Sequence, residues 1–260
     1  MASDDTPVRS VERALTLLGV VAHGEEMQLG ELAQAAGLAP STAHRLLTTL
    51  VDLGFLQQDS ESRLYGVGHG LLGLVSAAEQ RLSGLRAAAL PHMTELAAAC
   101  EETAHLTILD GSEVIFIEQV LGPRTVRMEV KVGTRMLAHV TAAGKALLAW
   151  QPEAQLGPVL AAELKGFTPQ TVTDPGALQR ELALVRKRGW ATEVEEHELG
   201  AACVAAPIVF GPRAPFASLS ISGPTSRLRP AQLKDLGTRI REAADGIAGS
   251  LSTPNQNGQH

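Results

Sequence analysis

The stretch GLAPSTAHRLLTTLVDLGFL, from Gly37 to Leu56, carries side chains that can read DNA rather than merely solubilise a helix. Pro40 suits the first turn of a helix, because its missing N–H would have no partner there. Helical spacing then gives an exposed face made of Ser41, Thr42, His44, Arg45 and Thr48. Arginine can bind guanine through two hydrogen bonds, histidine can donate to a base or a phosphate, and short hydroxyl residues let the backbone approach. This face predicts DNA binding; the alternative is an ordinary polar face on a three-helix bundle.

The surrounding sequence supplies the elements that would hold this face. Apolar spacing predicts helices over residues 8–22, 29–36 and 40–53, with Gly37 ending the second helix in a left-handed conformation and Gly54 capping the third. The third helix would bury the stripe Ala43, Leu46, Leu47 and Leu50. The segment FLQQDSESRLYGVG predicts two short strands around a polar tip, and Arg63 beside that tip could contact a flanking phosphate. Together these elements predict a winged helix-turn-helix.

The charge of this segment gives no general attraction to nucleic acid. The whole chain has a net charge of -6, and its first 84 residues contain five Arg, no Lys and ten Asp or Glu. The non-specific phosphate contribution should therefore be weak, so that specific contacts and dimerisation must supply the affinity.

The rest of the chain predicts an α+β domain. A helix over 69–84 is expected to link the two domains, with the boundary at Gly84, followed by a helix over 85–101. Strands are expected at 103–109, 113–120, 124–132, 203–209 and 215–222, and helices from Thr141 and over 152–163, 175–189 and 230–251. The expected fold is an antiparallel sheet with helices packed on it. The predicted organisation is a DNA-binding domain at 8–68, a linker helix at 69–84 and a second domain at 85–253.

The strand PFASLSIS alternates between apolar and hydroxyl side chains. Ala217, Leu219 and Ile221 would face one side, and the other side would carry Ser218, Ser220 and Ser222. A row of hydroxyls could donate hydrogen bonds to a small carboxylate or keto acid. A solvated strand face explains the same pattern and remains open at this point.

The enzymatic interpretations are weaker. Cys203 and His197 could form the nucleophile and base of a hydrolase, but the sequence shows neither their proximity nor an orienting group. The charged segment EVEEHELG has one His and no HExxH spacing, so a solvated loop is expected there and no metal site. The segment AAGKA lacks the glycine and the hydroxyl residue of a phosphate loop. We therefore expect no enzyme activity, no metal and no cofactor.

The composition indicates in which compartment of the cell the protein would act. The chain has 260 residues, 45% of them hydrophobic, and no apolar run approaches the roughly 20 residues that cross a bilayer. Its two cysteines are too few for a disulfide framework. We expect a globular, cytoplasmic protein with reduced thiols.

The motifs quoted above, with AHVTAAGKALLA and ELGAACVAAPIVFGPRAPFASLSISGP, resemble the IclR family of bacterial transcriptional regulators. The resemblance covers residues 8–250. It implies a winged-helix domain, a linker helix, an α+β effector-binding domain, and assembly into dimers or tetramers on a palindromic operator in double-stranded DNA.

The resemblance also implies positions that contact a small organic acid. Ser220, Ser222 and Cys203 match effector-contacting positions, and Ala142 and Ala143 match backbone donors at the start of a helix that Thr141 would cap. Glu193 stands where relatives commonly have Asp, and its extra methylene group would shrink the pocket or move the carboxylate. Met128 and Met136 would be apolar walls of the pocket, although core packing explains methionines equally well.

Overall fold

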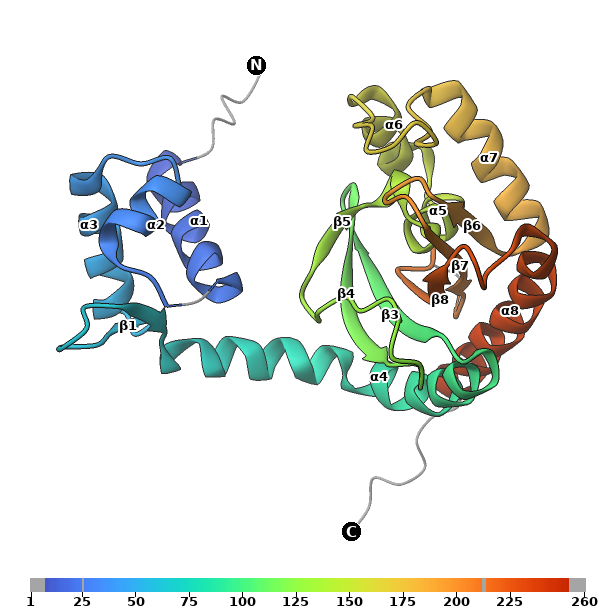
Figure 1. Cartoon of the computed structure of the whole chain (residues 1–260), viewed down its shortest axis with the longest axis horizontal. Coiled ribbons are helices and arrows are strands. Elements are labelled where there is room, and N and C mark those ends of the chain that lie inside the picture. Colours follow the sequence, from blue (N-terminus) through green and yellow to red (C-terminus); the bar gives the residue numbers. More distant parts are fainter. Residues whose placement is uncertain (1–7, 25, 212–213, 253–260) are drawn as a thin grey trace, which may run out of the picture. The chain divides into compact units, whose positions relative to one another are not determined.

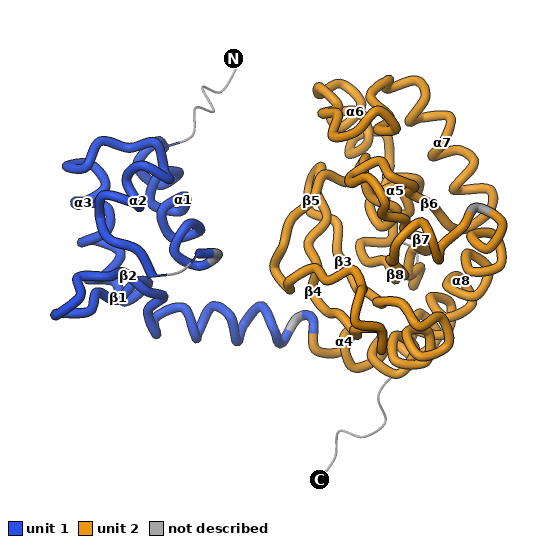
Figure 2. The backbone as a smooth tube through the Cα atoms, viewed as in Figure 1, with its two compact units in different colours: residues 1–82 blue, residues 83–260 orange. Residues whose placement is uncertain are grey.

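A computed structural model of the chain describes residues 8–24, 26–211 and 214–252. The chain forms two compact units, residues 1–82 and 83–260, which are coloured separately in Figure 2. Each unit buries its own apolar cluster. The exact bounds expected for the domains, 8–68, 69–84 and 85–253, stay a prediction, and residue 253 lies outside the described residues.

The first unit contains the elements of a winged helix-turn-helix. They are α1 (Arg9–His23), α2 (Leu29–Ala35), α3 (Pro40–Asp52), β1 (Leu56–Gln58) and β2 (Tyr65–Val67), with the two strands paired antiparallel. The core combines Leu17 of α1, Leu32 of α2, and Leu47 of α3. The order of elements predicted from the sequence is confirmed.

Glycines set the two turns that flank α3. Gly37 has a φ of 63° between α2 and α3, and Gly54 has a φ of 75° just after α3. Both need the left-handed conformation that glycine adopts without steric cost. A side chain at Gly68 would overlap the carbonyl group of Gly54, so the end of the hairpin packs directly on the end of α3.

One long helix follows the hairpin. After the short 3-10 helix η1 (His69–Leu71), α4 runs without interruption from Leu72 to Cys100. The expectation of two helices meeting at Gly84 is therefore wrong. Gly84 does not adopt a positive φ, so it does not end the helix, and a glycine inside a helix costs only about 1 kcal/mol relative to alanine.

The second unit is built on a six-stranded antiparallel sheet. Its strands are β3 (Thr103–Asp110), β4 (Glu113–Val120), β5 (Arg135–Leu137), β6 (Ala191–Val194), β7 (Ala201–Ile208) and β8 (Ala217–Pro224), in the spatial order β5-β4-β3-β8-β7-β6. Strands β3 and β8 are neighbours although more than a hundred residues separate them, because β8 pairs with β3 along its length. The predicted α+β fold with an antiparallel sheet is confirmed.

Helices cover both faces of this sheet. The remaining helices are η2 (Ala138–Val140), α5 (Ala142–Leu148), α6 (Glu153–Ala161), α7 (Pro175–Arg188) and α8 (Pro230–Ser252). The sheet lies between α5 and α8 (Figure 1), which both pack on β7 and β8. Ser218 and Ser220 are consequently buried together with Leu219 and Ile221. The interpretation of the serine row as a solvated face is wrong.

The alternating segment 124–132 is not a strand. Residues 121–134, which we call the connecting segment, run from β4 to β5 and belong to no strand, and β5 itself pairs only with residues 113–115 of β4. Val126 and Val132 are exposed, whereas Met128 and Val130 are half-buried. Two strands, β5 and β6, were not predicted.

Among the helices that the structure describes, none combines the length and the apolar character needed to span a membrane.

The contact of α5 with η2 requires a glycine at position 144. A Cβ at Gly144 would overlap the backbone of Ala138. We expect Gly144→Ala to destabilise the protein by about 3 kcal/mol or more, since the backbone cannot yield as a side chain can. Chemical denaturation measures this loss. Gly157→Ala in α6, where the added methyl group meets nothing within 4 Å, is the matched control and should not lower the stability. Equal stability of the two variants would contradict the packing described.

Candidate functional site

The exposed face of α3 carries the polar residues predicted from the sequence. Ser41, His44, Arg45 and Thr48 are exposed and Thr42 is half-buried, while the opposite face buries Ala43, Leu47 and Leu50. The hydroxyl of Thr48 donates to the carbonyl of His44 at 2.9 Å, so its proton is used within the helix and only its lone pairs remain for another partner. The face thus presents one guanidinium and one imidazole among short side chains.

Arg63 lies at the tip of the β1–β2 hairpin. It is exposed and has a φ of 60°, unusual for a residue with a side chain. Asp59 holds the tip by accepting hydrogen bonds from the backbone of Ser62 at 2.7 Å and of Glu61 at 3.1 Å. These bonds lower the pKa of the Asp59 carboxyl, and the bond from Ser62 has the largest effect. The hairpin that presents Arg63 is therefore locally fixed.

The second unit contains a small cavity of about 70 Å³ between the sheet, α5 and the connecting segment. All eight residues expected to contact an effector line it: Met128, Met136, Ala142, Ala143, Glu193, Cys203, Ser220 and Ser222. Further residues that line the cavity were not predicted from the sequence: His105, Phe116, Val130, Val140, Ala201 and Ala202. Thr141 and His197, considered above in other roles, line it as well.

Strand register explains how distant residues meet on the cavity floor. Ser222 lies opposite Cys203, and Cys203 lies opposite Glu193, so three adjacent strands contribute one polar row. Directly opposed side chains in an antiparallel sheet lie on the same face, about 5 Å apart. In the neighbouring row His105 lies opposite Ser220. The floor therefore combines hydroxyls, a thiol, a carboxyl and an imidazole.

Glu193 is 5% exposed, and its environment favours the neutral carboxyl. Burial has the largest effect and raises its pKa to about 7. Hydrogen bonds from two backbone N–H groups act in the opposite direction, because they favour the ionised form. These are donated to Oε1 by Glu196 at 2.6 Å and by His197 at 3.3 Å. The expectation that the whole segment EVEEHELG is a solvated loop is wrong, because Glu193 and Glu196 are both buried.

Serine side chains on β8 take different roles. Ser218 contacts Thr107 at 2.7 Å and donates to the carbonyl of Ala143 at 3.3 Å, so it fixes α5 to the sheet. Ser222 contacts Nδ1 of His105 at 3.2 Å. Thr141 caps α5 by accepting from the N–H of Gly144 at 3.0 Å, as predicted. The start of α5 is thereby held above the polar row.

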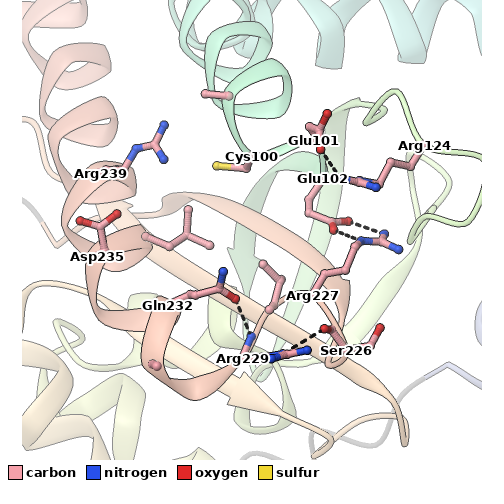
Figure 3. A pocket seen from close by; sticks show the side chains of 14 residues that line it. Cys100, Glu101, Glu102, Arg124, Ser226, Arg227, Arg229, Gln232, Asp235 and Arg239 are labelled. Carbon is pink, nitrogen blue, oxygen red and sulfur yellow. Dashed lines mark hydrogen bonds and ion pairs between the residues drawn. The ribbon is translucent and has the colours of Figure 1, made fainter.

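The connecting segment forms the apolar wall of the cavity and is anchored at both ends. Gly133 donates to the carbonyl of Phe116 at 2.7 Å, next to β5. At the other end Arg227 donates to the carbonyl of Val126 at 2.8 Å and forms an ion pair with the buried Glu102, shown in Figure 3. Between these anchors Met128 and Val130 face the cavity.

A second cavity, of about 660 Å³, lies beside this anchor and differs in character. Figure 3 shows its charged lining, which includes Arg124, Arg227, Arg229, Arg239 and the acids Glu101, Glu102 and Asp235. Arg124 pairs with Glu101 and Arg227 pairs with Glu102. This space is far larger and more polar than the cavity under α5, and none of the predicted effector residues lines it. The cavity under α5, which all eight predicted residues line, is the candidate small-molecule site.

A buried ion-pair cluster supports the candidate site from behind. The side chain of Lys145 on α5 is 0% exposed, and its Nζ lies 2.5 Å from Oε1 of Glu196 and 2.7 Å from Oε1 of Glu181. Glu196 also donates its backbone N–H to Glu193. Lys145 thus ties α5 to the segment that carries the cavity carboxyl. In the described part of the chain, no three His, Cys, Asp or Glu side chains are grouped so as to hold a metal ion.

The fold and the helix-turn-helix define a DNA-binding transcriptional regulator with a separate α+β domain. Family models agree: the IclR helix-turn-helix domain matches residues 10–60, and the bacterial transcriptional regulator IclR C-terminal domain matches residues 80–249. The chain belongs to the IclR family of transcriptional regulators.

Individual relatives span nearly the whole chain. The HTH-type transcriptional regulator BhcR of Paracoccus denitrificans is 38% identical over 94% of this chain and 87% of its own length. The transcriptional repressor IclR of Escherichia coli is 38% identical over 92% of this chain and 89% of its own length. An IclR homologue from Microbacterium hydrocarbonoxydans, solved in complex with 4-hydroxybenzoate, has a TM-score of 0.77 at 30% identity, covering 93% of this chain and 98% of that one.

We expect Lys145→Met to destabilise the protein by about 3–5 kcal/mol, because it leaves the buried Glu196 carboxylate without its cation. Thermal or chemical unfolding measures the change. Lys234→Met on the exposed side of α8 removes the same charge at the surface and should alter stability by less than about 0.5 kcal/mol. If the two variants unfolded alike, the ion pair would have no structural role.

Proposed function

We propose that this protein binds a palindromic operator as a homodimer and that a short organic acid in the cavity under α5 modulates this binding. The observation that carries the proposal is the pairing of an exposed polar face on α3 with a small, mostly apolar cavity in a separate unit, whose floor carries a few polar groups. Because its target is chromosomal DNA, the protein would act in the cytoplasm.

On DNA, α3 would enter the major groove, as the second helix of a helix-turn-helix does. Arg45 and His44 would contact base edges, and Ser41, Thr42 and Thr48 would contact the backbone or admit it closely. Arg63 on the hairpin would contact a flanking phosphate. The few basic residues in this unit make these specific contacts more important than general phosphate attraction.

The surface of α1 supports a homodimer. Val11 and Leu15 are exposed and lie on one face of α1, and the exposed Val8 stands at the N-cap of this helix. Exposed apolar faces of this kind mark contact with a partner. A two-fold pair of this unit would place two copies of α3 on the two half-sites of a palindrome. The expectation of a dimer or a tetramer thus becomes a proposal for at least a dimer.

Cavity size favours a short acid. The cavity has a volume of about 70 Å³, far below the volume of about 660 Å³ beside Glu102. An aromatic acid such as the 4-hydroxybenzoate of the structural relative is larger than this. We therefore propose an aliphatic acid of about two to four carbons. Its carboxylate would accept from Ser220, Ser222 and the first N–H groups of α5, which have no partner within the helix.

The hydrolase hypothesis is disfavoured by the state of Cys203. Burial raises the pKa of this thiol far above its usual range, and the nearby Glu193 charge raises it further. The thiolate is the nucleophilic form of cysteine, so an active nucleophile here would need the opposite shift. We propose a ligand-contacting role for Cys203 and His197 and no catalysis.

We expect Arg45→Ala to weaken specific operator binding by about 1–3 kcal/mol per half-site while leaving acid binding unchanged. Gel-shift titration against a duplex selected from a random pool measures the first, and calorimetry the second. Arg180→Ala, an exposed arginine of the second unit, is the matched control and should bind the duplex normally. Full operator affinity in Arg45→Ala would exclude α3 as the reading helix.

The affinity for an acid should depend on the ionisation of Glu193. Its carboxyl is neutral below a pH of about 7 and ionised above it, where it would repel the bound anion. We expect affinity to fall by up to about tenfold per pH unit as the pH rises above that value, because one proton must then be taken up on binding. Calorimetry across this range tests it.

Two variants test whether the ionisation of Glu193 causes this pH dependence. Glu193→Gln should flatten the pH profile, since it keeps the acceptor for the two backbone N–H groups but cannot ionise. Glu198→Gln, at an exposed position of the same segment, should leave the profile as in the wild type. A wild-type profile without slope, or one that Glu193→Gln leaves unchanged, would show that Glu193 does not face the ligand's charge.

A further inference from the structure

The charged cavity shown in Figure 3 has no role in the proposed function. It lies between the end of α4, the start of α8 and the turn that precedes α8. Its volume of about 660 Å³ is within the range of roughly 300–1,000 Å³ that small-molecule sites occupy. The lining combines four guanidinium groups with three carboxylates and several apolar side chains. The cavity is therefore large enough for a metabolite, and its charges decide which kind of metabolite fits.

Two of the four guanidinium groups are already neutralised by the fold. Arg124 pairs with Glu101, and Arg227 binds both oxygens of Glu102, a carboxylate that is 1% exposed. Glu102 is enclosed so tightly that a Cβ at Gly223 would overlap its carboxylate. These two ion pairs hold the wall of the cavity and leave no net charge for a ligand.

The other two guanidinium groups have no such partner. Among the described residues, no carboxylate lies within ion-pair distance of Arg229 or Arg239. Arg229 donates from Nε to the carbonyl of Ser226 at 3.3 Å, which leaves its two terminal nitrogens for another partner. Arg239 is half-buried and forms no hydrogen bond with a residue that the structure describes. A guanidinium that is partly removed from water without an anion is unfavourable, so Arg239 is a group that a ligand would stabilise.

The acids around Arg239 do not neutralise it. Asp235 is exposed on α8 one turn before Arg239, and no ion pair joins the two. A smaller cavity of about 260 Å³ adjoins the charged cavity at Ala99 and Arg239, and its lining includes Glu95 and Glu242. These two acids would keep an anion out of the smaller cavity. In the charged cavity, two unpaired guanidinium groups face one unpaired carboxylate, and the balance is positive.

Two arginines with free terminal nitrogens favour a phosphate group over a single carboxylate. The planar fork of each arginine donates parallel hydrogen bonds to the oxygens of either anion. A phosphate ester carries about 1.5 to 2 negative charges at neutral pH and three terminal oxygens, so two arginines can share it. A carboxylate has one charge and two oxygens, and a second arginine would gain less from it.

The remaining space and lining fit an esterified body. Leu228 and Leu236 provide apolar surface in the same cavity. Gln232 accepts a hydrogen bond at Oε1 from the backbone N–H of Arg229 at 3.2 Å, so its NH₂ is the end left to donate to a ligand. The cavity can thus hold a phosphate together with an uncharged, partly polar group.

We propose that the charged cavity is a second ligand site of this protein, which takes a phosphorylated metabolite and binds its phosphate through Arg229 and Arg239. The site does not depend on an acid in the cavity under α5. Arg227 belongs to its lining and also donates to the carbonyl of Val126, in the wall of the other cavity, at 2.8 Å. A ligand at this site is therefore one side chain away from the wall of the cavity under α5.

Protection of Cys100 from alkylation tests the proposal at the site itself. Cys100 is half-buried, lines the charged cavity and turns its sulfur toward Arg239 in Figure 3. The full-length protein is treated with uncharged iodoacetamide at constant ionic strength, and mass spectrometry measures the rate at each cysteine. Inorganic phosphate and glucose 6-phosphate should slow the alkylation of Cys100 until the site is saturated. Glucose, which lacks the phosphate, should have no effect.

Two internal comparisons locate the effect and its chemistry. Cys203 lines the cavity under α5 and should show no protection by either phosphate compound. Protection of Cys203 in place of Cys100 would put the phosphate in the other cavity and overturn the proposal. Succinate is also doubly negative but carries its charges on two separate carboxylates, so it should protect Cys100 only at concentrations at least about tenfold higher. Equal protection by succinate would overturn the assignment to phosphate.

Substitution of the two arginines completes the test. Arg229→Gln and Arg239→Gln should each raise the protecting concentration of glucose 6-phosphate at least about tenfold, because each removes charge-assisted hydrogen bonds. Neither arginine has an ion pair to lose, so both variants should fold. Arg186→Gln, at an exposed position of α7 outside the cavity, removes the same charge and should leave protection unchanged.

Two results would contradict the second site. One is wild-type Cys100 that neither phosphate compound protects, and the other is protection that both arginine variants retain in full. Either result leaves the proposed function standing, because neither Arg229 nor Arg239 lines the cavity under α5. Conversely, a protein that binds no short acid but protects Cys100 in the expected way would lose the proposed effector and keep this site.

Discussion

The close docking of α5 on the sheet is the constraint on which the second unit depends. Gly144 lets α5 approach η2 more closely than any side chain would allow, and Ser218 fixes the carbonyl of Ala143 to β8. All seven residues of α5 are buried as a result. This docking encloses the row formed by Ser222, Cys203 and Glu193, which would otherwise be an open strand face. Burial in turn raises the pKa of Glu193, and the row leaves hydrogen-bonding groups that a small ligand can satisfy.

Burial of α5 also removes the ammonium group of Lys145 from water, and two carboxylates compensate for this loss of hydration. Lys145 is held by Glu196 and Glu181, and one oxygen of Glu196 has no hydrogen-bond partner among the described residues. A buried ion pair is rarely a large net source of stability, but removing one member is costly. Here the pair connects the helix above the cavity with the segment that donates to Glu193. The arrangement of the cavity therefore depends on residues that do not line it, such as Lys145.

Local patterns predicted much of the fold and the site. Helical spacing and turn glycines predicted α1, α2 and α3 together with the polar face of α3, and strict alternation predicted β8 with its serines. Patterns that depend on distant partners were misread. The segment 124–132 alternates as a strand does, yet it belongs to no strand, and Met128 and Val130 line the cavity instead. The place of His105 on the cavity floor was missed because it depends on the pairing of β3 with β8. The burial of Glu196 was missed because its partner Lys145 is distant in sequence.

We propose that the binding of the acid and the binding of the operator are coupled within this protein. Coupling of two binding equilibria is reciprocal, so whatever factor the acid imposes on operator affinity, the operator must impose on acid affinity. The most direct measurement is calorimetric titration of lactate or pyruvate into the free protein and into the protein saturated with its selected duplex. Our account predicts that the dissociation constant differs between the two, by the same factor by which saturating acid changes operator affinity. Identical acid affinity with and without the operator would contradict it.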